Sequence, residues 1–186
     1  MSDRYCPACG TNGPALVGRR GDKDVVECSG CGLILESSNP LPWQPIGEVL
    51  VAEDSDLLRV ALEDVLLDRK LARSVTGTRN GQEFLEVFTS RLRTGRPIEL
   101  VMIDVRMPVM TGFNAAVALR AVERAFAVAP VPVLFFSSQP CDENARKVVE
   151  FVGRSIYVNK DASPNLAALA QRVEQVLVKL LTTGIS

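Results

Sequence analysis

The sequence predicts an α/β protein in which a doubly wound parallel sheet carries helices on both faces and follows a small cysteine-rich unit. From residue 47 onward, short apolar runs alternate with apolar residues at helical spacing, a pattern typical of a covered parallel sheet. Residues 1–38 hold two Cys-x-x-Cys pairs, a spacing that favours metal binding. Residues 39–46 contain three prolines, which favour an extended linker because proline restricts φ and removes a backbone donor. We therefore expect three parts, at 1–38, 39–46 and 47–186.

The elements of the larger part follow from the spacing of apolar residues along the chain. Strands are expected at 48–52, 71–75, 100–103, 131–136 and 155–158, the second being the weakest and the fourth having its proline near its beginning. Helices are expected at 57–66, 84–92, 115–126, 142–151 and 166–181. Ser163 is predicted to cap the last helix, with Pro164 in its first turn. This order matches a flavodoxin-like fold.

The composition limits what the chain can do. Hydrophobic residues make up 47% of the 186 residues, which is enough for a proper core. The net charge is −1, from 21 basic and 22 acidic residues, so the chain lacks the basic excess typical of nucleic-acid binding. There is no histidine, which excludes Ser/His/Asp and Cys/His catalysis and histidine-ligated metals.

The chain is expected to be cytoplasmic, without membrane insertion. Its beginning lacks an apolar targeting run, and the apolar stretches elsewhere are too short to cross a bilayer. In a reducing cytosol, paired cysteines act more often as metal ligands than as disulfides. We also predict that Trp43, the only tryptophan, anchors the linker on a domain surface.

Polar residues follow four of the five expected strands. Glu53 and Asp54 come directly after the first, Asp104 after the third, Ser137 after the fourth, and Lys160 two residues after the fifth. Because the carboxyl ends of parallel strands lie at one edge of the sheet, these side chains should meet there. Taken alone, the acids after the first strand could simply favour the dipole of the next helix.

Three carboxylates in one place repel each other and stay ionised only beside a cation. Mg²⁺ is the expected ion, since proteins hold it with carboxylates, waters and a substrate phosphate. A carboxylate such as Asp104 can also attack a phosphoryl group and form an aspartyl-phosphate. Lys160 and Ser137 could then stabilise the oxygens of the transferring group.

These residues resemble the receiver domain of bacterial two-component response regulators. The resemblance rests on Glu53-Asp54, on the run Asp-x-x-Met-Pro-x-Met-x-Gly at 104–112, on Ser137 and on Tyr-Val-Asn-Lys at 157–160. It covers residues 46–183. Two features depart from the family pattern. The segment 54–104 is several residues longer than usual, with the extra length expected in 89–97, and Asp161 replaces the usual proline, so no cis peptide is expected before it.

The resemblance assigns a role to each site residue. It makes Asp104 the phosphoacceptor. Asp54 and Asp104 would bind Mg²⁺ directly, Glu53 through water, and Arg106 through its main-chain carbonyl. The resemblance also implies that Lys160 contacts the phosphoryl group.

Ser137 and Tyr157 match the switch pair of the family. The resemblance implies that Ser137 moves inward to bind the phosphoryl group, and that Tyr157 rotates into the vacated space. This would reshape the surface of the fourth helix, fifth strand and fifth helix.

The four N-terminal cysteines are a second candidate site. Cys6, Cys9, Cys28 and Cys31 form two pairs separated by eighteen residues, and four thiolates suit a closed tetrahedral Zn²⁺ site. The apolar residues at 25–26 and 33–35 look like hairpin strands, and the whole resembles a zinc ribbon. Zinc would supply most of its folding free energy, so chelation should unfold 1–38 and leave the larger domain largely intact. Disulfide pairing or a redox role is the alternative. The fifth cysteine, Cys141, is expected to be a surface thiol at a helix end rather than a metal ligand.

The functional prediction is a phosphorylation-controlled adaptor that is not an enzyme. A histidine kinase would phosphorylate Asp104, and the altered surface, with the ribbon, would engage an unknown protein target. No output domain is expected, and a phosphorylation-dependent homodimer is a further candidate assembly. Two alternatives stay open. One is a transcription or nucleic-acid regulator acting through the ribbon, although Arg19-Arg20 is the only basic pair in residues 1–40. The other is a receiver-like scaffold that is not phosphorylated.

Overall fold

The computed structural model describes residues 3–38, 44–161, 163 and 165–183. The predicted place of Trp43, most of the linker and Pro164 lie outside them. The first part of the chain forms a small antiparallel sheet with the strand order β1-β2-β3-β4. Its strands are β1 (Asp3–Cys6), β2 (Thr11–Arg20), β3 (Lys23–Cys28) and β4 (Ile34–Ser37). The two strands expected around the second cysteine pair are therefore confirmed as β3 and β4, which pair with each other.

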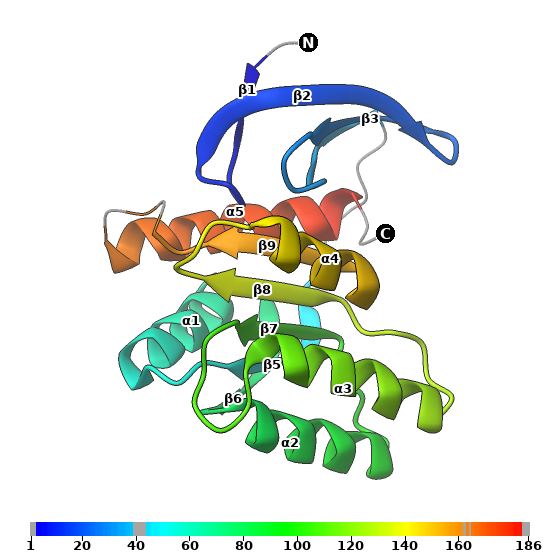
Figure 1. Ribbon diagram of the computed structural model, residues 1–186, viewed down its shortest axis with the longest axis vertical. Helices are drawn as coiled ribbons and strands as arrows, with labels where there is room; N and C mark the ends of the chain where they lie inside the picture. Colours follow the sequence, from blue (N-terminus) through cyan, green and yellow to red (C-terminus); the bar gives the residue numbers. More distant parts are fainter. Residues whose placement is uncertain (1–2, 39–43, 162, 164, 184–186) are drawn as a thin grey trace.

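The larger part is the predicted doubly wound domain (Figure 1). Its sheet is parallel, with the strand order β6-β5-β7-β8-β9. The strands are β5 (Ile46–Ala52), β6 (Ala72–Thr78), β7 (Leu100–Asp104), β8 (Val133–Ser137) and β9 (Ser155–Asn159). The helices are α1 (Asp56–Asp68), α2 (Gly81–Arg93), α3 (Gly112–Ala125), α4 (Glu143–Val152) and α5 (Leu166–Thr183). This confirms the predicted flavodoxin-like architecture.

Strand residues divide alternately between two cores, one on each face of the sheet. On β7, Leu100 and Met102 join the core beneath α1 and α5, whereas Val101 and Ile103 join the core beneath α2, α3 and α4. All four are at most 1% exposed. Successive side chains of a strand point to opposite faces, so a continuous apolar run is what a strand covered on both faces requires.

Two local predictions are corrected by the structure. Asn165, not Ser163, caps α5, because the Asn165 Oδ1 accepts a hydrogen bond from the backbone N–H of Ala168 at 2.9 Å. The hydroxyl oxygen of Ser163 instead accepts from Arg172 at 2.8 Å. The second strand also runs further than predicted and ends at Thr78, whose hydroxyl donates to the backbone of Val51. No cis peptide occurs among the described residues, in agreement with the expectation at Asp161.

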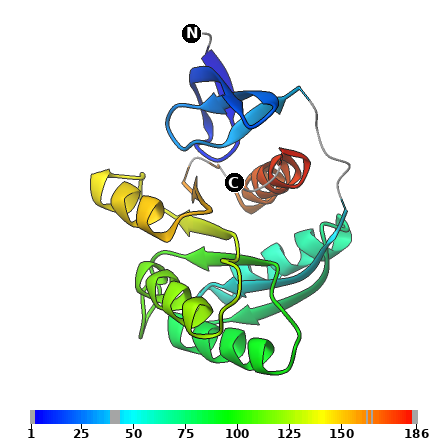
Figure 2. The same ribbon diagram turned by 90° about the vertical axis from the view of Figure 1, so that its right-hand side faces the viewer.

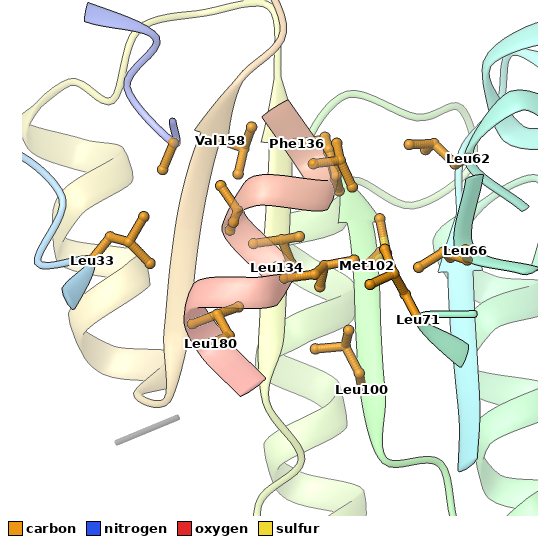
Figure 3. Packing of buried hydrophobic residues seen from close by; sticks show 14 of the residues in the cluster. Leu33, Leu62, Leu66, Leu71, Leu100, Met102, Leu134, Phe136, Val158 and Leu180 are labelled. Carbon is orange, nitrogen blue, oxygen red and sulfur yellow. The ribbon is translucent and has the colours of Figure 1, made fainter. Parts of the chain in front are cut away.

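The N-terminal sheet lies against α5, so that α5 is placed between it and the parallel sheet (Figure 2). Buried residues from both parts form one hydrophobic cluster. Figure 3 shows Leu33 of the N-terminal part, Val158 of β9 and Leu180 of α5 among the members of this cluster. At the charged edge of this contact, the Lys179 Nζ donates to the backbone oxygen of Leu35 at 2.6 Å. No helix in the described part of the chain has the length and apolar character needed to cross a membrane.

Candidate functional site

The structure brings Glu53, Asp54 and Asp104 together at the carboxyl edge of the sheet. We call these three residues the acidic cluster; their ligand oxygens all lie within 4.8 Å of one another. Glu53 and Asp104 are buried, and Asp54 is exposed. They meet because β5 and β7 are neighbouring parallel strands whose pairing ends at Ala52 and Ile103, directly before these acids.

Lys160 reaches the acidic cluster from the end of β9. Its Nζ lies 2.6 Å from the Glu53 Oε2 and 3.1 Å from the Asp104 Oδ1. Its backbone N–H donates to the oxygen of Ser137 at 2.7 Å, which continues the ladder between β8 and β9. The lysine side chain is 11% exposed, so it is a largely desolvated cation aimed at the carboxylates.

Burial and charge act in opposite directions on the two buried acids. Burial raises the pKa of the Asp104 carboxyl, while the Lys160 ammonium and the N–H of Arg106 oppose this rise. Burial likewise raises the pKa of Glu53, again against the effect of Lys160. The protein alone therefore penalises full ionisation of the acidic cluster, and one lysine offsets only part of the penalty.

The donor set of the acidic cluster fits Mg²⁺. The ion prefers hard oxygen ligands and is commonly held by one or two carboxylates with waters and phosphate oxygens. The exposed Asp54 and the buried Asp104 offer such oxygens, and the buried Glu53 adds a third carboxylate. A second cation would also neutralise the charge that Lys160 leaves uncompensated. Arg106, whose carbonyl is the predicted main-chain ligand, lies two residues after Asp104, and its N–H donates to the Asp104 Oδ1 at 3.3 Å.

The loop after β7 packs tightly against the backbone of Asp104. A Cβ placed on Gly112 would lie 2.1 Å from the Asp104 carbonyl oxygen. The N–H of Gly112 donates to the oxygen of Val105 at 3.0 Å. Within the same turn, Val109 has a φ of 65° and is exposed. The Met-Pro-x-Met-x-Gly run therefore forms a compact turn, and its glycine is required by space.

Ser137 and Tyr157 lie on neighbouring strands close to the acidic cluster. The Ser137 hydroxyl oxygen accepts from the N–H of Gln139 at 3.0 Å, and Ser137 is 1% exposed. The Tyr157 hydroxyl donates to the oxygen of Gln139 at 2.8 Å, and burial raises the pKa of this phenol. Both predicted switch residues thus contact the same loop residue, and Tyr157 already occupies a buried position in this structure.

The four N-terminal cysteines converge on one point. We call Cys6, Cys9, Cys28 and Cys31 the cysteine cluster; their sulfur atoms lie within 4.8 Å of one another. The Sγ atoms of Cys6 and Cys31 are 3.5 Å apart, and those of Cys9 and Cys28 are 3.8 Å apart. Zn–S bonds of about 2.3 Å in a tetrahedron place neighbouring sulfurs about 3.8 Å apart. The cysteine cluster therefore has the dimensions of a tetrahedral thiolate site.

Both turns of the cysteine cluster have the same backbone geometry. The N–H of Gly10 donates to the oxygen of Cys6, and that of Gly32 to the oxygen of Cys28, each at 2.8 Å. The two glycines have φ values of 75° and 74°, in the region that side chains disfavour. The hydrogen bond with Cys31 holds the pKa of the Cys6 thiol well below its usual range, and the same contact raises the pKa of the Cys31 thiol. A dication bound by both sulfur atoms would displace their protons.

Two arginines that hold the segments next to the acidic cluster were not predicted from the sequence. Arg59 of α1 donates to the backbone oxygen of Glu53 at 3.0 Å and pairs with Asp56, which holds the loop that carries the acids. Arg172 of α5 is 5% exposed and binds both the N-terminal part and the loop after β9. The sequence does indicate that Arg172 is buried, because it lies one residue before Val173 on the apolar stripe of α5.

The response regulator receiver domain family matches residues 49–174. A hybrid signal transduction histidine kinase I from Dictyostelium discoideum is 24% identical over 156 residues, which are 82% of this chain and 8% of that protein. A protein-glutamate methylesterase/protein-glutamine glutaminase from Geobacillus kaustophilus is 30% identical over 136 residues, which are 72% of this chain and 36% of that protein. The chain thus spans a small part of these relatives.

Solved structures support the same fold. One is the receiver domain of the histidine kinase CKI1 from Arabidopsis thaliana, complexed with Mg²⁺ and BeF₃⁻. It has a TM-score of 0.54 at 24% identity and covers 69% of this chain and 88% of its own. A chain of the CheX–CheY–BeF₃⁻–Mg²⁺ complex from Borrelia burgdorferi has a TM-score of 0.53 at 19% identity, with 69% and 87% covered. Since the family match spans more than half of the chain and its parallel sheet has the fold of these receiver domains, the protein belongs to the response regulator receiver family of two-component signalling.

Proposed function

We propose that the protein accepts a phosphoryl group on Asp104 from a histidine kinase and responds by changing a protein-docking surface. The observation that carries this proposal is the arrangement of one buried carboxylate between a lysine and two further acids at the strand edge. Asp104 is 6% exposed and its Oδ1 lies 3.1 Å from the Lys160 Nζ. Lys160 therefore stands next to the oxygen atoms of Asp104, where a transferring phosphoryl group would carry its charge.

The proposed reaction is a single phosphoryl transfer. A carboxylate oxygen of Asp104 forms a bond to phosphorus as the bond from phosphorus to the donor breaks, and the donor leaves with that electron pair. Lys160 balances charge on the phosphoryl oxygens, while Asp54 and Asp104 would hold Mg²⁺ together with the carbonyl of Arg106. Bound Mg²⁺ supplies Lewis-acid stabilisation of the same oxygens. Glu53 keeps Lys160 in place through their 2.6 Å contact.

The response is proposed to begin at Ser137. Its hydroxyl lies at the end of β8, next to the strand that carries Asp104, and it would turn to donate to a phosphoryl oxygen. That change would release the N–H of Gln139, whose carbonyl binds the Tyr157 hydroxyl. Because Tyr157 is already buried, we propose that the loop containing Gln139 moves, rather than the ring of Tyr157 from outside to inside. The docking surface next to β9 and α4 would change with it.

The cysteine cluster is proposed to hold one structural Zn²⁺. Its sulfur spacing and its two matching turns support this, as does the absence of another ligand type within the cluster. All four positions of the tetrahedron would be filled by protein, which suits a structural site. Metal content measured on the purified chain, with Cys31→Ser as the variant that removes one ligand, tests this part directly.

Phosphorylation of the intact chain tests the central proposal. Incubation with acetyl phosphate and Mg²⁺ should add the mass of one phosphoryl group to the wild type and none to Asp104→Ala. Glu143→Gln, on the exposed beginning of α4, is the matched control and should be labelled like the wild type. Labelling of the Asp104→Ala variant would place the acceptor elsewhere. Absence of labelling in the wild type would favour an unphosphorylated scaffold.

A further inference from the structure

The first cysteine turn contacts the end of β9, directly before Lys160. The backbone oxygen of Ala8, which lies between Cys6 and Cys9, accepts a hydrogen bond from the N–H of Asn159 at 3.1 Å. β9 is an edge strand of the parallel sheet, so this N–H has no further strand to pair with. The first cysteine turn thus satisfies the last backbone donor of β9, one residue before Lys160.

Arg172 joins the same cysteine turn to the same strand end. Its guanidinium donates to the oxygens of Pro7 and Ala8, each at 2.9 Å, on the N-terminal side. On the other side it donates to the Asn159 oxygen and the Ser163 Oγ, each at 2.8 Å. Arg172 is 5% exposed and forms no ion pair among the described residues. Its buried charge is therefore compensated by these oxygens alone, which makes their geometry costly to disturb.

These contacts hold the backbone on both sides of Lys160. Before it, the N–H of Asn159 is bound by Ala8 and its carbonyl by Arg172. After it, the Ser163 N–H donates to the Lys160 oxygen at 3.1 Å, and the Ser163 hydroxyl is bound by Arg172. The position of the Lys160 ammonium against Glu53 and Asp104 therefore depends on a backbone segment that the N-terminal part helps to hold.

We propose that the cysteine cluster and the acidic cluster are coupled, with Arg172 as the positioning residue between them. A Zn²⁺ ion held by the four thiolates would keep Pro7 and Ala8 in place, and through Arg172 and Asn159 would keep Lys160 in place. Loss of the ion would loosen Lys160. Because the Lys160 ammonium lies 3.1 Å from the Asp104 Oδ1 and competes with Mg²⁺ for the negative charge of the acidic cluster, Mg²⁺ binding would become tighter, while phosphoryl acceptance would slow. The phosphoryl part of this inference rests on the proposed phosphoacceptor function, and the coupling rests on the proposed binding of Zn²⁺ and Mg²⁺.

Coupling between two binding sites has a signature that a merely structural arginine would not produce. If Zn²⁺ lowers the affinity for Mg²⁺ by some factor, Mg²⁺ must lower the affinity for Zn²⁺ by the same factor. Typical couplings of this kind change affinity by about fivefold or more. A residue that only supports the fold would lower both affinities without creating such a reciprocal dependence.

The experiment uses the full chain in four forms, which are the zinc-loaded wild type, the zinc-free wild type and two zinc-loaded variants. The wild type is titrated with Mg²⁺ by calorimetry, once loaded with Zn²⁺ and once after a chelator selective for Zn²⁺ over Mg²⁺. Zn²⁺ affinity is then measured by chelator competition with and without Mg²⁺. Arg172→Lys keeps the charge but cannot bridge four oxygens with one ammonium. Lys179→Met is the matched control, because Lys179 also joins α5 to the N-terminal part, at Leu35, without touching the loop at Lys160.

We expect Zn²⁺ to lower the wild-type Mg²⁺ affinity about fivefold or more, and Mg²⁺ to lower the Zn²⁺ affinity equally. Zinc-loaded Arg172→Lys should bind Mg²⁺ as tightly as the zinc-free wild type, and zinc-loaded Lys179→Met as weakly as the zinc-loaded wild type. Equal Mg²⁺ affinity of Arg172→Lys and the wild type would overturn the proposal. So would an equal change in both variants, which would indicate general destabilisation.

Labelling by acetyl phosphate separates this inference from the proposed function. Zinc-loaded Arg172→Lys should be labelled at Asp104 more slowly than the wild type, because its Lys160 is held less firmly against the phosphoryl oxygens. If no form is labelled while the two metals remain reciprocally linked, the phosphoacceptor function fails and the coupling stands. If the wild type is labelled and the metals are independent, the function stands and the coupling fails.

Discussion

Burial at Asp104 opposes the charge that its chemistry needs. Its carboxylate is removed from water beside two other acids, and a single lysine offsets part of this cost. Removing the negative charge while keeping the shape of the side chain should therefore stabilise the folded state of the metal-free protein. The same reasoning explains why a divalent cation would stabilise the folded state, since it would bind only where the acids are held together.

Asp104→Asn should raise the free energy of unfolding of the metal-free chain by on the order of 1 kcal/mol. Added Mg²⁺ should stabilise the wild type and leave the variant nearly unchanged. Urea unfolding with and without Mg²⁺ measures both effects. Asp64→Asn, at an exposed position of α1, is the control and should change little. A less stable Asp104→Asn variant would show that Lys160 already compensates the acidic cluster fully.

Gly112 is a second residue whose identity is set by contact with Asp104. Gly112→Ala would place a methyl group 2.1 Å from the Asp104 carbonyl oxygen. The backbone must shift, and we expect a loss of about 1–3 kcal/mol in stability together with slower phosphorylation. Gly18→Ala is the control, since nothing lies within 4 Å of its added Cβ. Chemical unfolding and acetyl phosphate labelling of both variants check this, and equal stability of the two would contradict it.

At the level of elements, the beginning of α5 sets the end of the loop that carries Lys160. Asn165 accepts from the N–H of Ala168 and so satisfies one of the free donors of the first turn. Asn165→Ala should cost about 1 kcal/mol of stability, and Asn165→Ser should restore most of it. Thermal unfolding of both variants measures the difference. If Asn165→Ala is as stable as the wild type, another group caps the helix.

The strands and helices themselves follow from short-range patterns. A covered parallel strand such as β7 is a continuous apolar run, because both faces are buried. The end of β6 was harder to predict, because it contains Thr76, Gly77 and Thr78 instead of an apolar run. Its pairing with β5, which continues to Thr78, overrides the weak local preference. The prediction that Ser163 caps α5 was wrong for a similar reason. Serine and asparagine are both good capping residues, but the Ser163 hydroxyl oxygen accepts a hydrogen bond from the distant Arg172.

At the scale of the whole molecule, the N-terminal part shares a hydrophobic core with the receiver domain. Leu33 is fully buried in the same cluster as Leu177 and Leu180 of α5. Truncating a buried leucine to alanine leaves a cavity, so Leu33→Ala should lower the free energy of unfolding by about 2–5 kcal/mol, and the unfolding of the receiver helices should report this loss. All helices of the described residues belong to the receiver domain, so the helical signal in circular dichroism reports on it. Val17→Ala, at a position 82% exposed, is the control.

Zinc removal tests the same shared core. If the two parts were independent, chelation would unfold residues 1–38 and leave the urea midpoint of the helical signal unchanged. Because the cysteine turns hold the residues that pack on α5, we expect that midpoint to fall instead. Urea unfolding of the zinc-loaded and chelated chain distinguishes the two cases. An unchanged midpoint would show that the receiver domain needs no support from the ribbon.

The sequence alone determined the features that depend on neighbouring residues. Apolar runs, helical spacing, paired cysteines and the polar residues at the ends of four strands are all local patterns, and the strand order of the fold then collects Glu53, Asp54, Asp104 and Lys160 at one edge. Only the tertiary structure decided where the ribbon lies and what Arg172 and Tyr157 touch. Arg172 binds Pro7 across 165 positions of sequence. Such contacts depend on how two surfaces meet, and no pattern of neighbouring residues encodes that.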